Sequence, residues 1–224
     1  MLHLNLQEHG VELMSGLISD ALIQDVISEV NTLNASMPKY GIRNAEKKLP
    51  SILKIVNSTI LIDEARKILG AEPKLVRAIF FDKTTEKNWL VPWHQDKTVT
   101  VNKKFNLEGW QPWTLKDDVI HVQPPVEVLN KMVTFRLHLD PTNDENGCLK
   151  IIPSSHRQGI LKQQQIDEVV LKGKPVLCVA DVGDTVIMRP HILHSSSKAL
   201  LPQHRRIVHL EFSSFELPEG IAWA

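Results

Sequence analysis

The last two-thirds of the chain is a series of short β-rich segments, and this pattern restricts the fold more than any other feature. After Pro73, six segments rich in Val, Ile, Leu and Phe follow one another: KLVRAIFFD, KMVTFRLHLD, CLKIIP, PVLCVA, DTVIMRP and RRIVHLEFSS. Turn sequences such as DENG, SSHRQG, LKGKP and DVGD separate several of them. Many short strands of this kind are typical of a β-sandwich or jelly roll.

The first third of the chain has a helical pattern instead. Residues 19–34 place their apolar side chains on one stripe, with Ser19 or Asp20 as the candidate N-cap. A second helical stretch covers residues 51–69 and ends at Gly70, a residue suited to the left-handed conformation that closes many helices. The pattern therefore predicts helices that support a β-rich body.

A length of 224 residues suits one domain with a sizeable core. We expect a single α+β domain over residues 1–224 that is mostly β. In this prediction, residues 1–72 form a mainly helical buttress and residues 73–224 form the β core.

Charge and hydropathy exclude several classes of partner. Lys and Arg together number 26, as do Asp and Glu, and this zero balance gives no general attraction to nucleic acid or anionic lipid. No apolar run reaches the roughly 18 residues that a membrane helix needs. The start, MLHLNLQEHG, does not resemble a signal peptide, and Cys148 and Cys178 stand in apolar segments typical of buried free thiols. These patterns predict a cytoplasmic protein without a nucleic-acid or membrane partner, and they leave the oligomeric state open.

Two β segments alternate between an apolar and a polar face. In VTFRLHLD, the side chains of Arg136 and His138 share the polar face. In RRIVHLEFS, Arg205, His209 and Glu211 share one face. The opposite face of that segment contains Arg206, Val208, Leu210 and Phe212. A polar strand face normally contacts water, and the alternative is a barrel with a polar interior that serves as a reaction site.

The segment WHQDKT contains the first candidate for chemistry. On an extended strand, the side chains of His94 and Asp96 fall on the same face. An imidazole and a carboxylate so placed can bind one metal ion, and a further His completes the two-His-one-carboxylate triad that is typical of Fe(II) sites with open positions. Because a second His-x-Asp exists at His138 and Asp140, the tripeptide alone does not locate the site.

The C-terminal third supplies the further histidine. GDTVIMRPHILH ends in His194, and a Ser-rich loop leads to a strand that opens with Arg205, eleven residues later. This length of strand, loop and return strand can bring both side chains into one cavity, where an Arg could bind a dicarboxylate through two hydrogen bonds. His191 and His194 are an alternative zinc pair, but no Cys or Glu completes a closed zinc site. We expect His191 at the surface or beside the ligands.

Taken in order, these elements resemble the phytanoyl-CoA dioxygenase family of iron and 2-oxoglutarate oxygenases. The chain has WHQD, then NGCLKIIPSSH, then HSSS, then HRR, which follow the order and spacing of that family's motifs. The resemblance extends from about Leu75 to Ser214. Ser154 stands where the family more often has Gly, and HSSSKAL lacks the Gly and Asn that are common in that loop.

The resemblance implies a double-stranded β-helix, which is a cupin-like barrel, and a metal centre in it. His94, Asp96 and His194 would bind Fe(II), with 2-oxoglutarate and O₂ as cosubstrates. Decarboxylation of 2-oxoglutarate to succinate and CO₂ would accompany hydroxylation of a C–H bond in a small-molecule substrate. The alternative from a different class is a non-catalytic barrel that binds a metal or small ligand as a sensor.

The resemblance also implies contacts to the cosubstrate. Arg205 would bind the distal carboxylate of 2-oxoglutarate. The other expected cosubstrate contacts are Ser196, Gln95 and Arg136. Position in the sequence, and not the resemblance, suggests the substrate contacts, since they lie within or flank WHQD, or share the face of Arg136. They are Arg77, Lys83, Trp93, Trp113 and His138. For the two cations the alternative is a solvated charge, and for the tryptophans it is simple packing.

One long interruption separates the β segments, at residues 102–130. It contains Trp110, Trp113 and several prolines, and it is too long for a tight hairpin. Loops of this length are usually functional or disordered, and the tryptophans favour order. We therefore expect it to be a lid over the mouth of the barrel, more mobile than the strands when substrate is absent.

Overall fold

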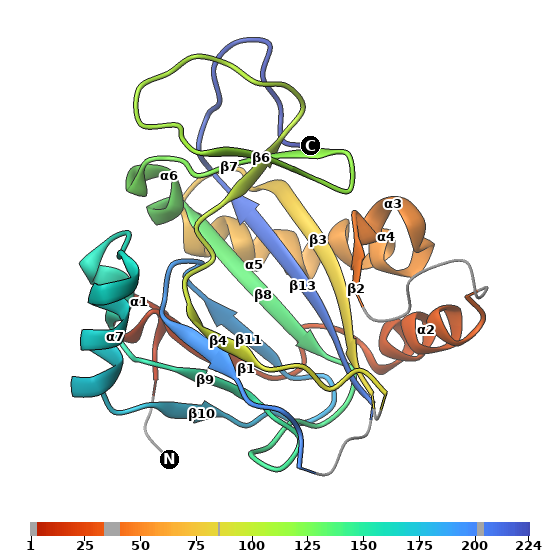
Figure 1. Cartoon of the computed structure of the whole chain (residues 1–224). Helices are drawn as coiled ribbons and strands as arrows, with labels where there is room; N and C mark the ends of the chain where they lie inside the picture. Colours follow the sequence, from red (N-terminus) through yellow and green to blue (C-terminus); the bar gives the residue numbers. More distant parts are fainter. Residues whose placement is uncertain (1–3, 34–40, 85, 201–203) are drawn as a thin grey trace.

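Two antiparallel sheets face each other in the computed structural model, which describes residues 4–33, 41–84, 86–200 and 204–224 (Figure 1). The larger sheet has the strand order β1 (Val11–Met14), β11 (Thr185–Met188), β8 (Met132–His138), β13 (Arg205–Ser213), β3 (Lys74–Lys83) and β2 (Gly41–Arg43). The smaller sheet has the order β10 (Val176–Cys178), β9 (Leu149–Ile151), β12 (His194–Ser196) and β4 (Val91–His94). This arrangement confirms the β-helix barrel, and the six expected β segments contain β3, β8, β9, β10, β11 and β13.

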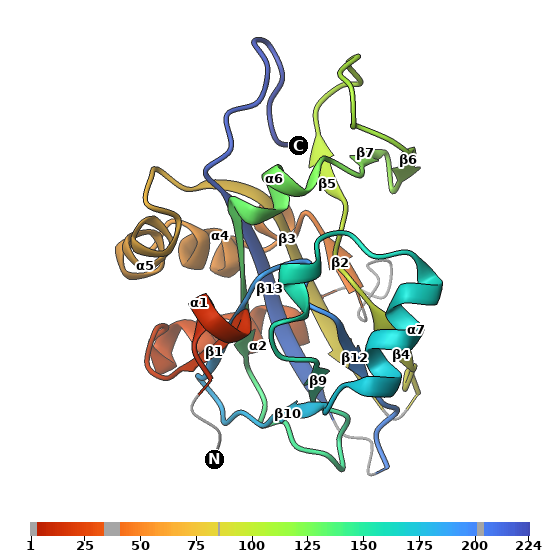
Figure 2. The same ribbon diagram turned by 90° about the vertical axis from the view of Figure 1, so that its left-hand side faces the viewer.

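The expected alternation in the larger sheet is confirmed, and it separates a core from an interior. Val208, Leu210 and Phe212 of β13 pack in one buried cluster with apolar residues of α2 (Asp20–Asn31), α4 (Pro50–Val56) and α5 (Thr59–Leu69). Figure 2 shows these helices on one side of the larger sheet, with the smaller sheet and α7 (Gln163–Lys172) on the other. The opposite face of β13 therefore points into the barrel.

The first predicted helix is confirmed, and the second differs from its prediction. Ser19 caps α2 by accepting a hydrogen bond from the main chain of Leu22, as expected, and α2 ends at Asn31. Residue 34 of the expected helix lies outside the described residues. The single helix expected over residues 51–69 is two helices, because Ser58 accepts a hydrogen bond from the main-chain N–H of Leu61 and starts α5.

Short elements complete the part before β3. They are α1 (Leu6–His9), β1, β2 and α3 (Ala45–Lys48). The strands β1 and β2 form the two edges of the larger sheet, so this region also contributes to the barrel and is not helical throughout.

The insert over residues 102–130 is folded. It contains β6 (Trp113–Lys116), β7 (Val119–Val122) and α6 (Val126–Asn130). In a third sheet, β7 pairs with β6 on one side and with β5 (Val99–Val101) on the other. Figures 1 and 2 show this sheet beyond one end of the two larger sheets. Trp110 and Trp113 contact Phe105, with ring centroids 4.9 and 5.2 Å apart, inside an apolar cluster that belongs to the insert and the C-terminal segment.

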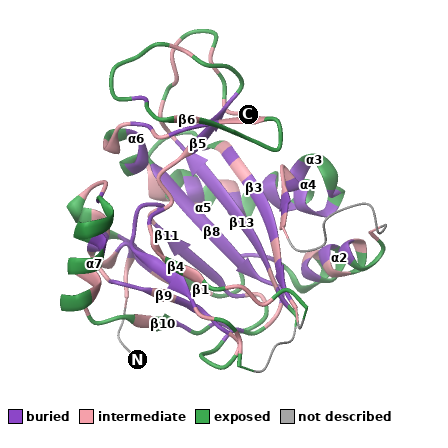
Figure 3. Cartoon of the chain, in the orientation of Figure 1, coloured by how far each residue is buried: buried purple, intermediate pink, exposed green. Residues whose placement is uncertain are grey.

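Burial follows this layering (Figure 3), because the strands of the two facing sheets are largely buried and the outer helix faces are exposed. A short 3₁₀ helix, η1 (Ser155–Gln158), follows β9. None of the helices in the described ranges is both long and apolar enough to cross a membrane.

Candidate active site

The side chains of His94, Asp96 and His194 converge inside the barrel. His94 ends β4 and His194 begins β12, and the two residues are direct partners across the strand pair. Asp96 Oδ1 lies 3.5 Å from Nε2 of His94, and Asp96 Oδ2 lies 3.4 Å from Nε2 of His194. The main-chain N–H of Asp96 donates to the carbonyl of Pro190 (3.0 Å), which fixes the residue after its strand has ended.

Both histidines are oriented by their own main chain. Nδ1 of His94 lies 2.8 Å from the carbonyl oxygen of Pro92, and Nδ1 of His194 lies 2.8 Å from that of Ile192. A carbonyl only accepts, so Nδ1 holds the proton and Nε2 presents its lone pair to a metal. Burial raises the pKa of Asp96, but His194 and His94 outweigh burial when their Nε2 atoms are protonated and hold that pKa well below its usual range. A bound metal would take the place of those Nε2 protons. Two neutral imidazoles and one carboxylate suit a divalent transition metal.

The competing His-x-Asp pair is not assembled. His138 points into the barrel, where burial and then Arg136 lower its pKa to about 3. Asp140 instead accepts two hydrogen bonds from the Arg206 guanidinium, at 2.8 and 2.6 Å. His191 is fully buried, which corrects the surface position we considered for it, and its ring packs against that of His156 with centroids 6.0 Å apart. Within the described ranges, no group that could hold a metal includes His191.

Three buried cations gather deeper in the barrel. Lys83 and Arg205 are direct partners across β3 and β13. Nζ of Lys83 donates to Ser196 Oγ (2.8 Å) and to the carbonyl of Ser197 (2.9 Å). Burial, and then Arg136, lowers the pKa of Arg205 to about 10. Burial, and then Arg205 and Arg136, lowers the pKa of Lys83 to about 7. These side chains are therefore not solvated charges.

The cations have no ion-pair partner in the part of the chain that the structure describes, although Asp96 attracts Arg136. Burying several like charges without an anion is costly, so this cationic cluster suits an acidic ligand. Arg205 donates to the carbonyl of Gly147, as does the hydroxyl of Ser196 (2.8 Å). The structure thus brings Arg205, Ser196 and Arg136 into one region, as expected of cosubstrate contacts.

Gly147 permits this packing. Its φ of +74° favours glycine, and a Cβ there would collide with the main-chain oxygen of Ser197. The Asn-Gly step in NGCLKII therefore lets the start of β9 approach the loop after β12.

A polar chain continues from the cations toward the other end of the barrel. Nη1 of Arg136 lies 3.1 Å from Nδ1 of His209, and because a guanidinium only donates, that nitrogen accepts. Nε2 of His209 then donates to Glu211 Oε1 (2.9 Å), which also accepts from Arg77 Nη2 (2.5 Å). Arg77, a tentative substrate contact, is thus ion-paired inside the barrel.

His209 and Glu211 also approach the metal trio. Their ligand atoms and that of Asp96 lie within 4.8 Å of one another, as do those of His94, Asp96 and His194. Because Arg77 neutralises Glu211, the second group is less suited to a cation than the first. The sequence placed His209 and Glu211 on the face of Arg205 but assigned them no role. Their position on that face was the signal that could have identified them.

Three expected contacts are placed elsewhere. Gln95 points away from Asp96, and its amide is saturated by the main chain of Gly159, His191 and Leu161 at 2.7–2.8 Å. Trp93 lies on the outer face of β4 with the apolar residues around α7, and Trp113 packs inside the insert. Strand alternation explains Gln95 and Trp93, because residues next to His94 must point the other way. Trp113 lies on β6 of the insert, away from His94 in the sequence.

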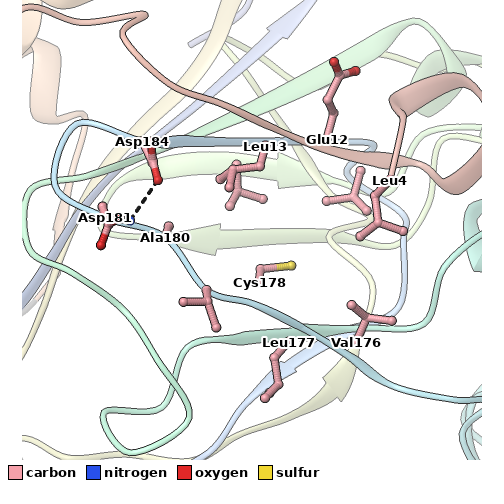
Figure 4. Close-up of a pocket in the computed structure, with 12 residues that line it drawn as sticks. Leu4, Glu12, Leu13, Val176, Leu177, Cys178, Ala180, Asp181 and Asp184 are labelled. Carbon is pink, nitrogen blue, oxygen red and sulfur yellow. Dashed lines mark hydrogen bonds between the residues drawn. The ribbon is translucent and has the colours of Figure 1, made fainter. Parts of the chain in front are cut away.

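A separate cavity of about 500 Å³ opens between the edge strands β1 and β10 (Figure 4). Its lining is mainly apolar and includes Leu13, Val176 and Cys178. Burial raises the pKa of Cys178 to about 12, so this thiol is not a reactive nucleophile near neutral pH.

Comparison with known proteins adds a family. The family model described as Phytanoyl-CoA dioxygenase (PhyH) matches residues 19–207. A comparison of the sequence with curated proteins finds no match.

Solved structures with the same fold are numerous. EctD from S. alaskensis with 2-oxoglutarate and 5-hydroxyectoine has a TM-score of 0.70 at 16% identity, covering 93% of this chain and 73% of its own. HygX from Streptomyces hygroscopicus with nickel and 2-oxoglutarate bound has a TM-score of 0.67 at 13% identity, covering 96% and 86%. The non-heme alpha ketoglutarate dependent epimerase SnoN from nogalamycin biosynthesis has a TM-score of 0.69 at 13% identity, covering 97% and 81%. At these identities the likeness shows a shared fold.

Proposed function

Because this chain belongs to the phytanoyl-CoA dioxygenase family, we propose that it is an Fe(II)- and 2-oxoglutarate-dependent dioxygenase that hydroxylates a C–H bond of a small molecule. The observation that carries the proposal is the pairing of two sites in one barrel. One is the trio of His94, Asp96 and His194, and the other is the buried cluster of cations around Arg205.

The trio would hold the metal from one side. The Nδ1–carbonyl hydrogen bonds of His94 and His194 fix both rings with Nε2 toward Asp96, so each of the three side chains would present one ligand atom to a metal. A two-His-one-carboxylate set would leave further ligand positions to the cosubstrates. Bound Fe(II) supplies the redox chemistry that couples oxidative decarboxylation of 2-oxoglutarate to oxidation of the substrate. EctD and HygX, which share the fold, were solved with 2-oxoglutarate.

The cationic cluster would hold the far end of the cosubstrate. Arg205 presents a guanidinium that can bind a carboxylate through two hydrogen bonds, and the Ser196 hydroxyl shares its acceptor, the carbonyl of Gly147. The charge of Arg136 acts on Arg205 and interacts with that of Asp96, so Arg136 can attract the carboxylate at the metal end. A five-carbon dicarboxylate fits this distribution of charge better than a neutral ligand does.

Succinate formation tests the proposal. The protein is loaded anaerobically with Fe(II) and 2-oxoglutarate, O₂ is admitted, and succinate is quantified. We expect slow succinate release even without substrate, and none from the Asp96→Ala variant. A sensor would bind the metal and 2-oxoglutarate without forming succinate, and that result would exclude an oxygenase. Because SnoN is described as an epimerase, a gain of one oxygen in the product mass is the separate test of hydroxylation.

A further inference from the structure

The barrel wall next to the metal trio contains buried polar atoms without hydrogen-bond partners. Among the described residues, none pairs with Oε2 of Glu211, Nε of Arg77 or either ring nitrogen of His121. The Glu211 side chain is 1% exposed and that of Arg77 is 10% exposed. Buried donors and acceptors without partners are costly, and their presence in one place indicates a ligand.

These atoms belong to three elements that meet at the insert end of the barrel. Glu211 on β13 and Arg77 on β3 are direct partners. His121 on β7 is paired with Thr100, whose hydroxyl donates to the carbonyl of Val76 (2.6 Å), the residue before Arg77. Figure 1 shows β7 beyond the ends of β3 and β13.

The side chains of Arg77, Glu211 and His121 lie close to one another and to the metal trio. The ligand atoms of Glu211 and Asp96 are within 4.8 Å of each other. The charges of Arg77 and Glu211 both act on His121, in line with the strand pairing and the Thr100–Val76 hydrogen bond. A substrate group held here would therefore lie beside the carbon that the metal centre would oxidise.

The charges of the group cancel. Glu211 is paired with Arg77 at 2.5 Å. His121 is neutral near pH 7, because burial and then Arg77 lower its pKa to about 4. An ammonium or a carboxylate placed here would be a buried charge without a counter-ion. A hydroxyl group is neutral, donates one hydrogen bond and accepts others, so it can satisfy Glu211 Oε2 together with Arg77 or His121.

We propose that Arg77, Glu211 and His121 form a subsite for a hydroxyl group of the substrate, and that the substrate is therefore an alcohol rather than an amine or an acid at this position. The proposal rests on the oxygenase function and adds a substrate class to it.

Ligand-observed NMR tests the proposal on protein loaded with diamagnetic Zn(II) and 2-oxoglutarate. The probes share one ring: cyclohexanol, cyclohexyl methyl ether, cyclohexylammonium and cyclohexanecarboxylate. We expect cyclohexanol to bind at least about fivefold more tightly than the other three, since each of them lacks a donor or adds a charge. Equal binding of the four, preference for a charged probe, or no binding of cyclohexanol would overturn the proposal. Failure of 2-oxoglutarate itself to bind would instead overturn the oxygenase function.

Two variants and a matched control assign the effect to the subsite. His121→Leu removes the ring nitrogens at similar volume, so the preference for cyclohexanol should fall by about fivefold while the Tm stays the same or rises. Glu211→Gln should also reduce the preference. Glu216→Gln changes an exposed glutamate, 78% accessible, and should leave the preference unchanged. Unaltered cyclohexanol preference in His121→Leu would contradict the subsite, whatever the behaviour of Glu211→Gln.

Discussion

Replacing Arg205 with Ala should weaken the apparent affinity for 2-oxoglutarate while leaving metal binding intact. The guanidinium is buried and lies beside Lys83 and Arg136, with no carboxylate partner in the described part of the chain. Removing one partner of a buried charge pair costs about 3–5 kcal/mol. Because Lys83 and Arg136 would remain to offset the ligand's charge, we expect a loss nearer 2–3 kcal/mol, or about 30- to 150-fold in KM.

Arg206→Ala is the matched control, because it removes the same side chain from the next residue of β13. Arg206 is bound to Asp140 on the outer side of the barrel, and both side chains are partly buried, 13% and 15% exposed. Its loss should cost about 1–3 kcal/mol of stability, intermediate between exposed and buried pairs. In a chain of this size that lowers the Tm by roughly 3–10 °C.

The assay measures succinate formation against 2-oxoglutarate concentration, with the Tm and metal content of each variant determined in parallel. Arg205→Ala should change KM strongly and Tm little, whereas Arg206→Ala should lower Tm and change KM little. A KM change below about threefold in Arg205→Ala would mean that the distal carboxylate does not bind at Arg205. A large KM change in Arg206→Ala would show that Arg206, and not Arg205, faces the cosubstrate, so the inner and outer faces of β13 would be assigned the wrong way round.

Three further outcomes are expected. Fe(II) or Zn(II) should raise the Tm of the wild type, and a chelator should reverse the increase. The Asp96→Ala variant should show no metal-dependent Tm shift, and a full shift in that variant would exclude Asp96 as a ligand. In the protein without ligands, burial and the charges of Arg205 and Arg136 lower the pKa of Lys83 to about 7, so the amine loses its proton as pH rises above 7. The KM for 2-oxoglutarate should therefore increase with pH above 7, by up to about tenfold per unit, and a flat profile from pH 6.5 to 8.5 would contradict this. Gly147→Ala should lower the Tm by roughly 3–10 °C, since it strains the positive φ and forces Cβ into the neighbouring loop; an unchanged thermal melt would refute that reading.

The sequence was sufficient to predict where a side chain lies wherever the pattern that places it falls within one short segment. Strand alternation in RRIVHLEFS put Arg205 and Arg206 on opposite faces, and the family resemblance chose Arg205 for the interior. The structure places Arg205 inside the barrel and Arg206 outside it. The order of motifs selected His94, Asp96 and His194, and the structure groups them, while their role as ligands stays a prediction.

Other features depend on contacts between distant segments and were therefore missed. His121 reaches the barrel only because β7 pairs with β5, and nothing within its own segment marks it. Gln95 was expected beside the cosubstrate because it stands between two candidate ligands, but alternation turns it to the other face. The tryptophans were expected at the substrate, yet Trp93 and Trp113 pack in apolar clusters. The expected mobility of the insert stays a prediction.

The two faces of β13 also limit how this chain can evolve. Val208, Leu210 and Phe212 anchor the strand to the helices, whereas His209 and Glu211 on the other face are joined mainly to each other and to two arginines. If the proposed subsite exists, substitutions on the inner face would alter substrate choice with little effect on the hydrophobic core. A deletion of one residue within the strand has the opposite effect, because it would exchange every inner side chain with an outer one. Diversification at this strand should thus proceed through point substitutions at alternate positions and hardly ever through changes in length.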